Sequence, residues 1–275
     1  MTVERTPLRQ LAVGLARAFG GAIFFSLPLL MTMEMWWLGF YMDRLRLALF
    51  LVVIVPVLVG LSHYAGFEET GRWSDDVRDA FVALFVGFLT SGIVLALTGV
   101  LESGAPLRET MGQIVIEAIP ASVGAVLAEA LFGADQPGSE RRKRETGYGG
   151  ELFLMAAGAI FFAFNVAPTD EMVLVAVKTT GWRVVTAALL SLLLMHAFVY
   201  AVEFRGRHSA PEGVGPWSVF LRFTVVGYAI VLLMSAYVLW TFGRLDHSSL
   251  GFQISATVVL ALPASLGAAA ARLVL

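Results

Sequence analysis

Two acidic residues lie at the same place in two similar apolar stretches. GAIFFSLPLLMTMEM begins at Gly21 and GAIFFAFNVAPTDEM begins at Gly158, an offset of 137 positions that places Glu34 opposite Glu171. An ionisable side chain in an apolar segment is costly in a membrane, and such residues commonly mark ion pathways or proton relays. The repeated acid therefore predicts that the protein binds a cation or a proton at membrane depth.

A proline precedes the acid in each stretch, Pro28 in the first and Pro168 in the second. Proline leaves a backbone carbonyl without its helical partner, and broken helices occur at membrane depth where protein or a water-filled cavity satisfies the backbone. We therefore predict helix breaks at both prolines. Carbonyls, hydroxyls and carboxylates together suit Na⁺, K⁺, Ca²⁺ or a proton. The predicted cation site consists of Glu34, Glu171, Asp170, Glu117, Thr32, Thr169 and Asn165.

Glu117 is a third acid at membrane depth, on a different span. Glu34 follows Ala18 by 16 residues, or about 24 Å of helix, in a hydrocarbon core about 30 Å thick. Glu34 therefore lies close to the outer surface. A span running the other way from Met111 places Glu117 about 9 Å from that outer surface. We therefore expect similar depths for these acids. Glu117 is as consistent with a lone buried acid as with an ion-coupling site.

A second interpretation of the acids involves no ion. APTDEMVLVAV, which begins at Ala167, is also typical of a helix start, with proline first and Asp170 and Glu171 in the first turn. Acids in that turn interact favourably with the helix dipole. The span would then end near Ala167, the acids would cap an interfacial helix, and Glu34 would extend to the outer interface. The sequence leaves both interpretations open.

The amino-acid composition indicates that the chain is a membrane protein. Apolar residues occupy 58% of the 275 positions and charged residues 15%, with a mean hydropathy of +0.79. Soluble domains contain about 45–50% apolar residues and about 25% charged residues. Lipid offers backbone amides no partner, so each span should be helical. We predict an all-α polytopic membrane protein with eight transmembrane helices, at residues 18–42, 47–67, 79–102, 111–133, 152–177, 184–204, 217–242 and 250–274.

The similarity between the two acidic stretches extends along the chain. We therefore predict two parallel four-helix repeats, residues 18–133 and 152–275, joined by a cytoplasmic linker at 134–151. Because four spans return the chain to the starting side, the repeats should be related by a pseudo-two-fold axis along the membrane normal. The further matches are YAGFE at Tyr64 with YAVEF at Tyr200, FVGF at Phe85 with VVGY at Val225, and IPASVGAVLAEAL at Ile119 with LPASLGAAAARLV at Leu262.

The distribution of basic residues predicts the orientation. With eight spans, twelve of the lysines and arginines fall on the side that holds both termini and six on the other side. Basic loops remain in the cytoplasm. We therefore expect both termini to be cytoplasmic and the protein to lie in the bacterial inner membrane.

One segment resembles a known family. FFSLPLLMTMEMWWLGFYMD, which begins at Phe24, is similar to the signature of a bacterial family of integral membrane proteins to which no function is assigned. The resemblance would cover nearly the full length of the chain. It implies a helical membrane fold and says nothing about chemistry.

Several classes of function lack their sequence signatures. The chain has no GxxxxGK[ST] motif for ATP-driven pumping, no HExxH or GxSxG motif and no cysteine, so we expect neither an enzyme nor a cofactor. The net charge of -2 gives no reason to expect nucleic acid.

Two hypotheses remain. The first is ion translocation, as a cation channel or a cation/proton-coupled carrier for a monovalent or divalent cation or a proton. A homodimer would then arrange four carboxylates around one pathway. The alternative is a non-conducting membrane sensor or a lipid- or partner-binding scaffold, in which the acids are helix caps.

Overall fold

The computed structural model describes residues 7–65, 73–102, 104–132, 147–200, 217 and 220–274, and all regular structure within these ranges is helical. The chain divides into two compact units, Met1–Glu145 and Thr146–Leu275. The all-helical prediction is confirmed for the part of the chain that the structure describes. Each unit is considered by itself below.

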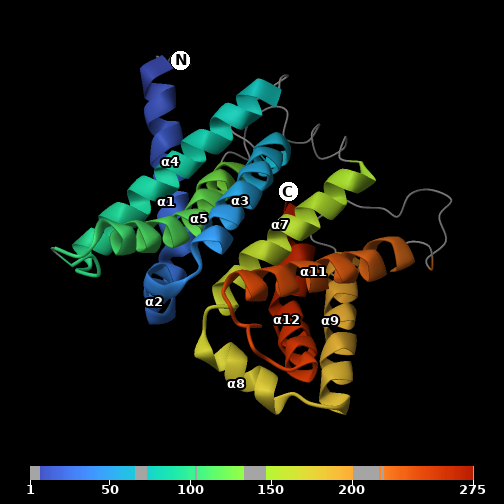
Figure 1. The fold of residues 1–275 in the computed structure, drawn as a ribbon. Helices are drawn as coiled ribbons and strands as arrows, with labels where there is room; N and C mark the ends of the chain where they lie inside the picture. The colour runs from blue at the N-terminus through green and yellow to red at the C-terminus, as the bar shows by residue number, and fades with distance from the viewer. Residues whose placement is uncertain are drawn as a thin grey trace. The chain divides into compact units, whose positions relative to one another are not determined.

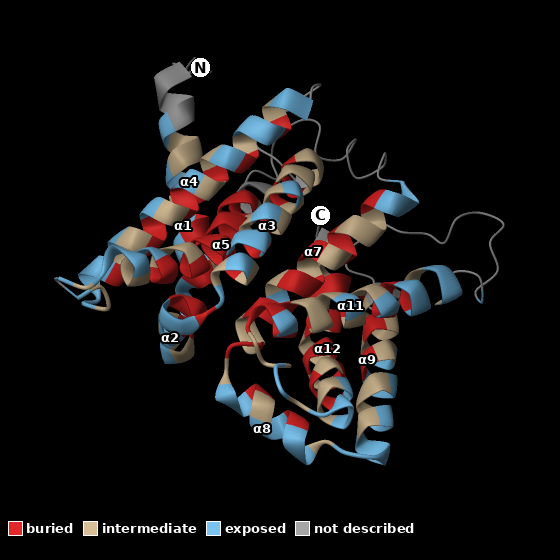
Figure 2. Cartoon of the chain, in the orientation of Figure 1, coloured by how far each residue is buried: buried red, intermediate tan, exposed pale blue. Residues whose placement is uncertain are grey.

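The first unit is built around one central helix. This helix, α5, is buried along most of its length (Figure 2), and α1, α2, α3 and α4 all pack against it. Small residues make the closest packing possible, because a Cβ atom on Gly21 of α1 would lie 2.6 Å from the carbonyl oxygen of Gly124. The helices are α1 Pro7–Leu30, α2 Met33–Tyr41, α3 Arg44–Ala65, α4 Trp73–Leu97 and α5 Leu107–Phe132 (Figure 1).

The second unit has a corresponding centre. Its last helix, α12, contacts α7, α8, α9 and α11. A Cβ atom on Gly158 of α7 would lie 2.6 Å from the Cβ of Ala271 and would also meet the carbonyl oxygen of Gly267. The elements are α7 Tyr148–Val166, α8 Asp170–Lys178, α9 Trp182–Tyr200, the π-helix η1 Phe220–Val225, α11 Val226–Thr241 and α12 Leu250–Val274 (Figure 1).

Two of the predicted spans are each divided into two separate α-helices. The predicted span 18–42 is divided into α1 and α2, and the predicted span 152–177 is divided into α7 and α8. Among the described residues, seven helices are long and apolar enough to cross a membrane, or up to eight if α8 and α9, which are bent by 119°, form one span. A polytopic membrane protein is therefore supported, and eight spans remain a prediction.

The linker predicted at 134–151 lies largely outside the described residues. Its last part is already helical, because α7 begins at Tyr148.

Candidate functional site

The first helix break lies between α1 and α2, and we call it the first junction (Met31–Thr32). Helix α1 continues past Pro28 and ends at Leu30. The Thr32 hydroxyl donates to the Pro28 carbonyl over 2.5 Å, and the Trp36 indole N–H donates to the Leu30 carbonyl over 2.9 Å. Two carbonyls at the end of α1 therefore have partners despite the break.

Glu34 lies in the first turn of α2 with a half-buried side chain. Thr32 is the N-cap residue of α2, but its side chain makes no capping hydrogen bond. The position of Glu34 suits the positive end of the helix dipole. Glu34 and Glu171 belong to different units, and each is placed only within its own unit.

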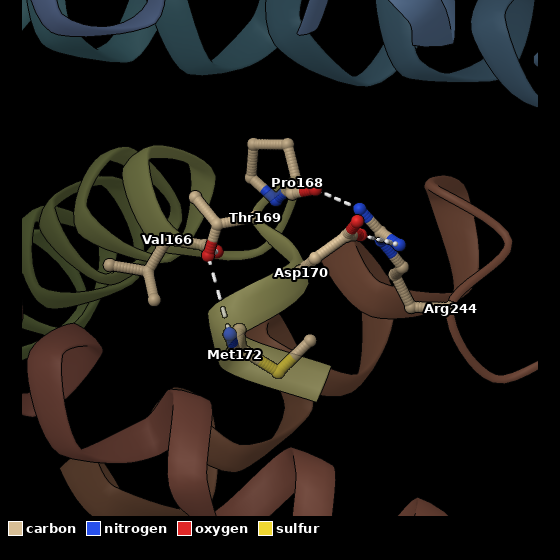
Figure 3. A network of polar contacts seen from close by, with 6 residues as sticks. All are labelled: Val166, Pro168, Thr169, Asp170, Met172 and Arg244. Carbon is tan, nitrogen blue, oxygen red and sulfur yellow. Dashed lines mark hydrogen bonds and ion pairs between the residues drawn. The ribbon is translucent and has the colours of Figure 1, made fainter. Parts of the chain in front are cut away.

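The second helix break is the second junction (Ala167–Thr169), between α7 and α8. It has the contacts of a helix start (Figure 3): the Thr169 hydroxyl oxygen accepts a hydrogen bond from the Met172 N–H over 3.4 Å, and the hydroxyl donates to the Val166 carbonyl over 2.9 Å. The side-chain amide of Asn165 donates within α7, to the Phe161 carbonyl, over 2.8 Å. Asn165 therefore takes part in local helix bonding.

Asp170 and Glu171 occupy the first turn of α8, and both are exposed. Carboxylates there stabilise the helix start through the dipole. The structure thus places the two acids in the exposed first turn of a helix, as the helix-cap interpretation describes.

An arginine that the sequence reasoning did not single out holds the second junction. The Arg244 guanidinium donates to Asp170 Oδ1 over 3.0 Å and also to the Pro168 carbonyl (Figure 3). Its side chain is 16% exposed, whereas that of Asp170 is 78% exposed. Pro168 itself is buried, so the bond to its carbonyl is the better shielded of the two contacts.

A glycine turn after α11 brings Arg244 to this position. Gly243 has a φ of +71°, its N–H bonds to the Trp240 carbonyl, and the N–H of Arg244 bonds back to the Leu239 carbonyl over 2.9 Å. This is the Schellman motif, in which glycine adopts the left-handed conformation at a helix end. In the sequence, a glycine followed by an arginine directly after an apolar span, Phe242-Gly243-Arg244, could have indicated this turn.

Glu117 is the most deeply buried candidate. Its side chain is 0% exposed, and neither carboxylate oxygen has a hydrogen-bond partner among the described residues. Polar groups buried in proteins are nearly always hydrogen-bonded. Glu117 is therefore the candidate residue whose environment requires an explanation beyond helix capping.

The helix packing shows where Glu117 points. Gln113, Glu117 and Gly124 share one face of α5, since they are separated by four and seven residues. Gln113 lies against Gly39 of α2, where a Cβ atom would come within 2.6 Å of the Gln113 backbone, and Gly124 lies against Gly21 of α1. Glu117 lies between these contacts and therefore faces the first junction.

Two hydroxyl groups of α4 lie at the same level as Glu117. A Cβ atom on Gly87 would lie 2.6 Å from the Ala118 carbonyl oxygen, and one on Gly92 would lie 3.9 Å from Ile114 Cδ1. Because α4 and α5 are antiparallel neighbours, the positions between these two glycines lie beside residues 114–118. Those positions include Thr90 and Ser91.

The hydroxyls of Thr90 and Ser91 are buried and have no partner among the described residues. By contrast, the buried hydroxyls of Ser26 and Ser122 donate to the carbonyl four residues earlier in their helices. The sequence reasoning missed this pair, although two adjacent hydroxyls in an apolar span were a visible signal.

A metal cluster is not formed by the described side chains. In the described ranges, no group of three or more His, Cys, Asp or Glu residues lies close enough to hold a metal ion. Among the described residues of the first unit, the buried side-chain polar atoms without a hydrogen-bond partner belong to one carboxyl group and two hydroxyl groups, which we call the Glu117 site (Thr90, Ser91 and Glu117).

Comparison with known proteins gives a family and no function. No curated protein and no solved structure matches the chain significantly. The profile of the family described as "Putative integral membrane protein (DUF2391)" matches residues 14–275. This match confirms the resemblance carried by the segment that begins at Phe24. The chain therefore belongs to this family of integral membrane proteins.

Proposed function

We propose that the protein translocates a cation or protons across the membrane and that Glu117 is the residue that binds the ion. The observation that carries this proposal is the fully buried carboxyl group without a partner, which faces the junction between two helices. A buried polar group without a hydrogen bond costs about 1–3 kcal/mol of stability. Ionisable residues inside membranes are uncommon and commonly belong to ion pathways.

The other acids receive different roles in this proposal. Glu34, in the first turn of α2, belongs to the same unit as Glu117 and carries charge near the first junction. Asp170 and Glu171 are exposed at the start of α8, and Asp170 is paired with Arg244. We assign these two acids to holding the second junction.

The rival function is a non-conducting sensor or scaffold. The cap at Thr169 and the exposed acidic first turn of α8 favour it, because they account for two of the acids without any ion. The sensor or scaffold function gives no role to the buried carboxyl of Glu117. A flux measurement distinguishes the two.

The deciding experiment is ion flux into liposomes that contain the purified protein, with a pH-sensitive dye inside and an imposed proton or cation gradient. We expect flux with the wild type and none above empty liposomes with Glu117→Gln, which keeps the size of the side chain and removes its charge. Asp170→Asn and Glu171→Gln should retain flux. Flux that is unchanged in Glu117→Gln would contradict the proposal, and absence of flux from the wild type under every gradient would favour the scaffold.

We also propose that the two units are repeats produced by duplication, in an eight-span protein with both termini in the cytoplasm. Support comes from the shared order of elements, a long helix, a short helix and three more helical segments, and from the matching helix crossings. Gly21 meets Gly124 and Ala128 in one unit, and Gly158 meets Gly267 and Ala271 in the other.

The absence of cysteine from the chain allows a direct test of this topology. Single cysteines at the exposed positions Ser74, Glu102 and Ser249 should react with a membrane-impermeant maleimide. Glu102 and Ser249 should be labelled from outside intact cells, and Ser74 only after the membrane is opened. Labelling of Glu102 and Ser249 from opposite sides would contradict the parallel repeat.

A further inference from the structure

The surroundings of Glu117 offer few ligands to a metal cation. Na⁺, K⁺ and Ca²⁺ are held by several oxygen atoms at once. At the first junction, the Pro28 and Leu30 carbonyls already accept hydrogen bonds from Thr32 and Trp36. Among the described residues, Glu117 belongs to no group of three or more His, Cys, Asp or Glu side chains that could hold a metal ion. A bound metal ion would depend on one carboxylate and the hydroxyls at its level.

Few charged groups of the neighbouring helices lie in the segments that pack near Glu117. Arg44 of α3 reaches α5 at Gly112, where its guanidinium would lie 2.6 Å from a Cβ atom. Gly112 precedes Glu117 by five residues, or about 7.5 Å along the helix. Glu34 is the acidic residue of α2. Residues 18–33 of α1, its junction and the start of α2, and residues 80–97 of α4, contain no ionisable side chain.

A neutral carboxylic acid fits this environment better than a carboxylate. A buried charge without a partner is strongly disfavoured, and such groups commonly become neutral instead. The neutral acid has one O–H donor and retains acceptor oxygens, and a hydroxyl group can both donate and accept. The hydroxyls of Thr90 and Ser91 lie at the same level of the packed helices and, like the Glu117 carboxyl, have no hydrogen-bond partner among the described residues.

We infer that the ion bound at the Glu117 site is the proton, held as the O–H of a neutral carboxylic acid that faces the first junction. This inference rests on the proposed function and narrows its substrate from cations in general to protons. Loading adds a proton to the carboxylate, and release returns that proton to water. No other reactant takes part.

The test is chemical labelling with dicyclohexylcarbodiimide, an apolar reagent that enters membranes. It reacts with a protonated carboxyl group: the acid proton moves to a carbodiimide nitrogen, the carboxyl oxygen bonds to the central carbon, and rearrangement leaves a stable N-acylurea. The purified protein in detergent or liposomes is treated over a range of pH, and the modified residue is identified by mass spectrometry of peptides. The measurement does not depend on transport.

We expect one labelled site, Glu117, with labelling that declines as the pH rises and does not respond to Na⁺, K⁺ or Ca²⁺ at constant pH. Glu117→Gln should lose the label and Glu34→Gln should keep it. Thr90→Val and Ser91→Ala, which remove the hydroxyls and keep similar volumes, should shift the pH range of labelling. Thermal unfolding of each variant checks that it is folded.

The outcomes separate this inference from the proposed function. Protection of Glu117 by a metal cation at constant pH would overturn the inference and leave cation translocation intact. Absence of labelling at every pH in a folded protein would also overturn it. Labelling as expected, with no proton flux in liposomes, would establish a protonated Glu117 and refute translocation.

Discussion

The two junctions differ in where their polar groups lie. At the first junction the polar group is inside, because Glu117 is buried on the face of α5 that is directed at the junction. At the second junction it is outside, because Arg244 binds the Pro168 carbonyl and Asp170 at the edge of the unit. In the proposed repeat, Leu260 occupies the position of Glu117 and is fully buried. In the proposed repeat, one position thus holds a buried acid in the first unit and a buried leucine in the second.

A single residue after a helix accounts for the external clamp. Both α4 and α11 end in the same turn, with Gly99 at a φ of +76° and Gly243 at +71°. The next residue is Val100 in the first unit and Arg244 in the second. The valine side chain has no group that can donate to a carbonyl, so Val100 cannot form a contact like that of Arg244. Under the proposed function, the first unit keeps a buried acid without a partner because that acid binds the ion, whereas Arg244 stabilises the second junction.

The largest effect on stability is expected at the glycine contacts between helices, which occur in each unit separately. Gly21→Ala and Gly158→Ala place a methyl group 2.6 Å from the Gly124 carbonyl oxygen or from Ala271 Cβ. Overpacking of this kind costs about 1–3 kcal/mol, occasionally more. SDS-titrated unfolding in micelles measures the cost. Gly20→Ala is the control, since nothing lies within 4 Å of its Cβ; equal stability of Gly20→Ala and Gly21→Ala would contradict the packing.

The next effect concerns the acid that distinguishes the cores. Glu117→Leu introduces the residue type that the second unit has at the corresponding position, Leu260. Because this substitution removes an unpaired buried carboxyl group, it should raise the free energy of unfolding by about 1–3 kcal/mol. The same variant should lose flux. Leu260→Glu is the reciprocal change and should destabilise the protein by at least as much. The same unfolding titration measures both, and a Glu117→Leu protein less stable than the wild type would mean that the carboxyl has a stabilising partner.

Opening the clamp should have a smaller effect. Arg244→Gln removes the charge-assisted bonds to the Pro168 carbonyl and Asp170 and should cost about 1–2 kcal/mol. Asp170→Asn should cost less than about 1 kcal/mol, because an exposed ion pair contributes little. Arg244→Lys keeps the positive charge but loses the planar guanidinium, which can donate two hydrogen bonds at once. Its loss of stability should therefore lie between those of the other two variants. Unfolding at low and high salt gives the values, and equal losses for Arg244→Gln and Asp170→Asn would show that the carbonyl bond adds nothing.

The smallest effect compares the two threonines before the short helices. Thr169→Ala removes a capping oxygen that accepts from the Met172 N–H and should cost about 1 kcal/mol. Thr32→Ala removes only a hydroxyl that donates to the Pro28 carbonyl, so we expect roughly half of that cost. Thermal unfolding of the two variants provides the comparison. A larger loss for Thr32→Ala would mean that the first junction, too, depends on its threonine.

The sequence determined the class of the protein and most of its helices. Apolar runs long enough to span a membrane admit only helical structure, so composition alone predicted the all-α fold. It also located both interruptions approximately, since APTDEM is typical of a helix start. In the first stretch the sequence pointed to Pro28, whereas α1 ends at Leu30. A proline removes one hydrogen bond, and the packing of the following turn decides where the helix ends.

Only the tertiary structure separated the candidate acids from one another. In the sequence Glu34, Glu171, Asp170 and Glu117 are all acids in apolar surroundings, and the repeated pair drew more attention than the solitary Glu117. Whether a carboxyl group is buried, paired or exposed depends on neighbouring helices that are distant in the chain. Gly21 and Gly39 bring α1 and α2 against α5 around Glu117, whereas Arg244 reaches Asp170 across 74 positions. Those contacts are set by packing between helices, which local sequence patterns do not encode.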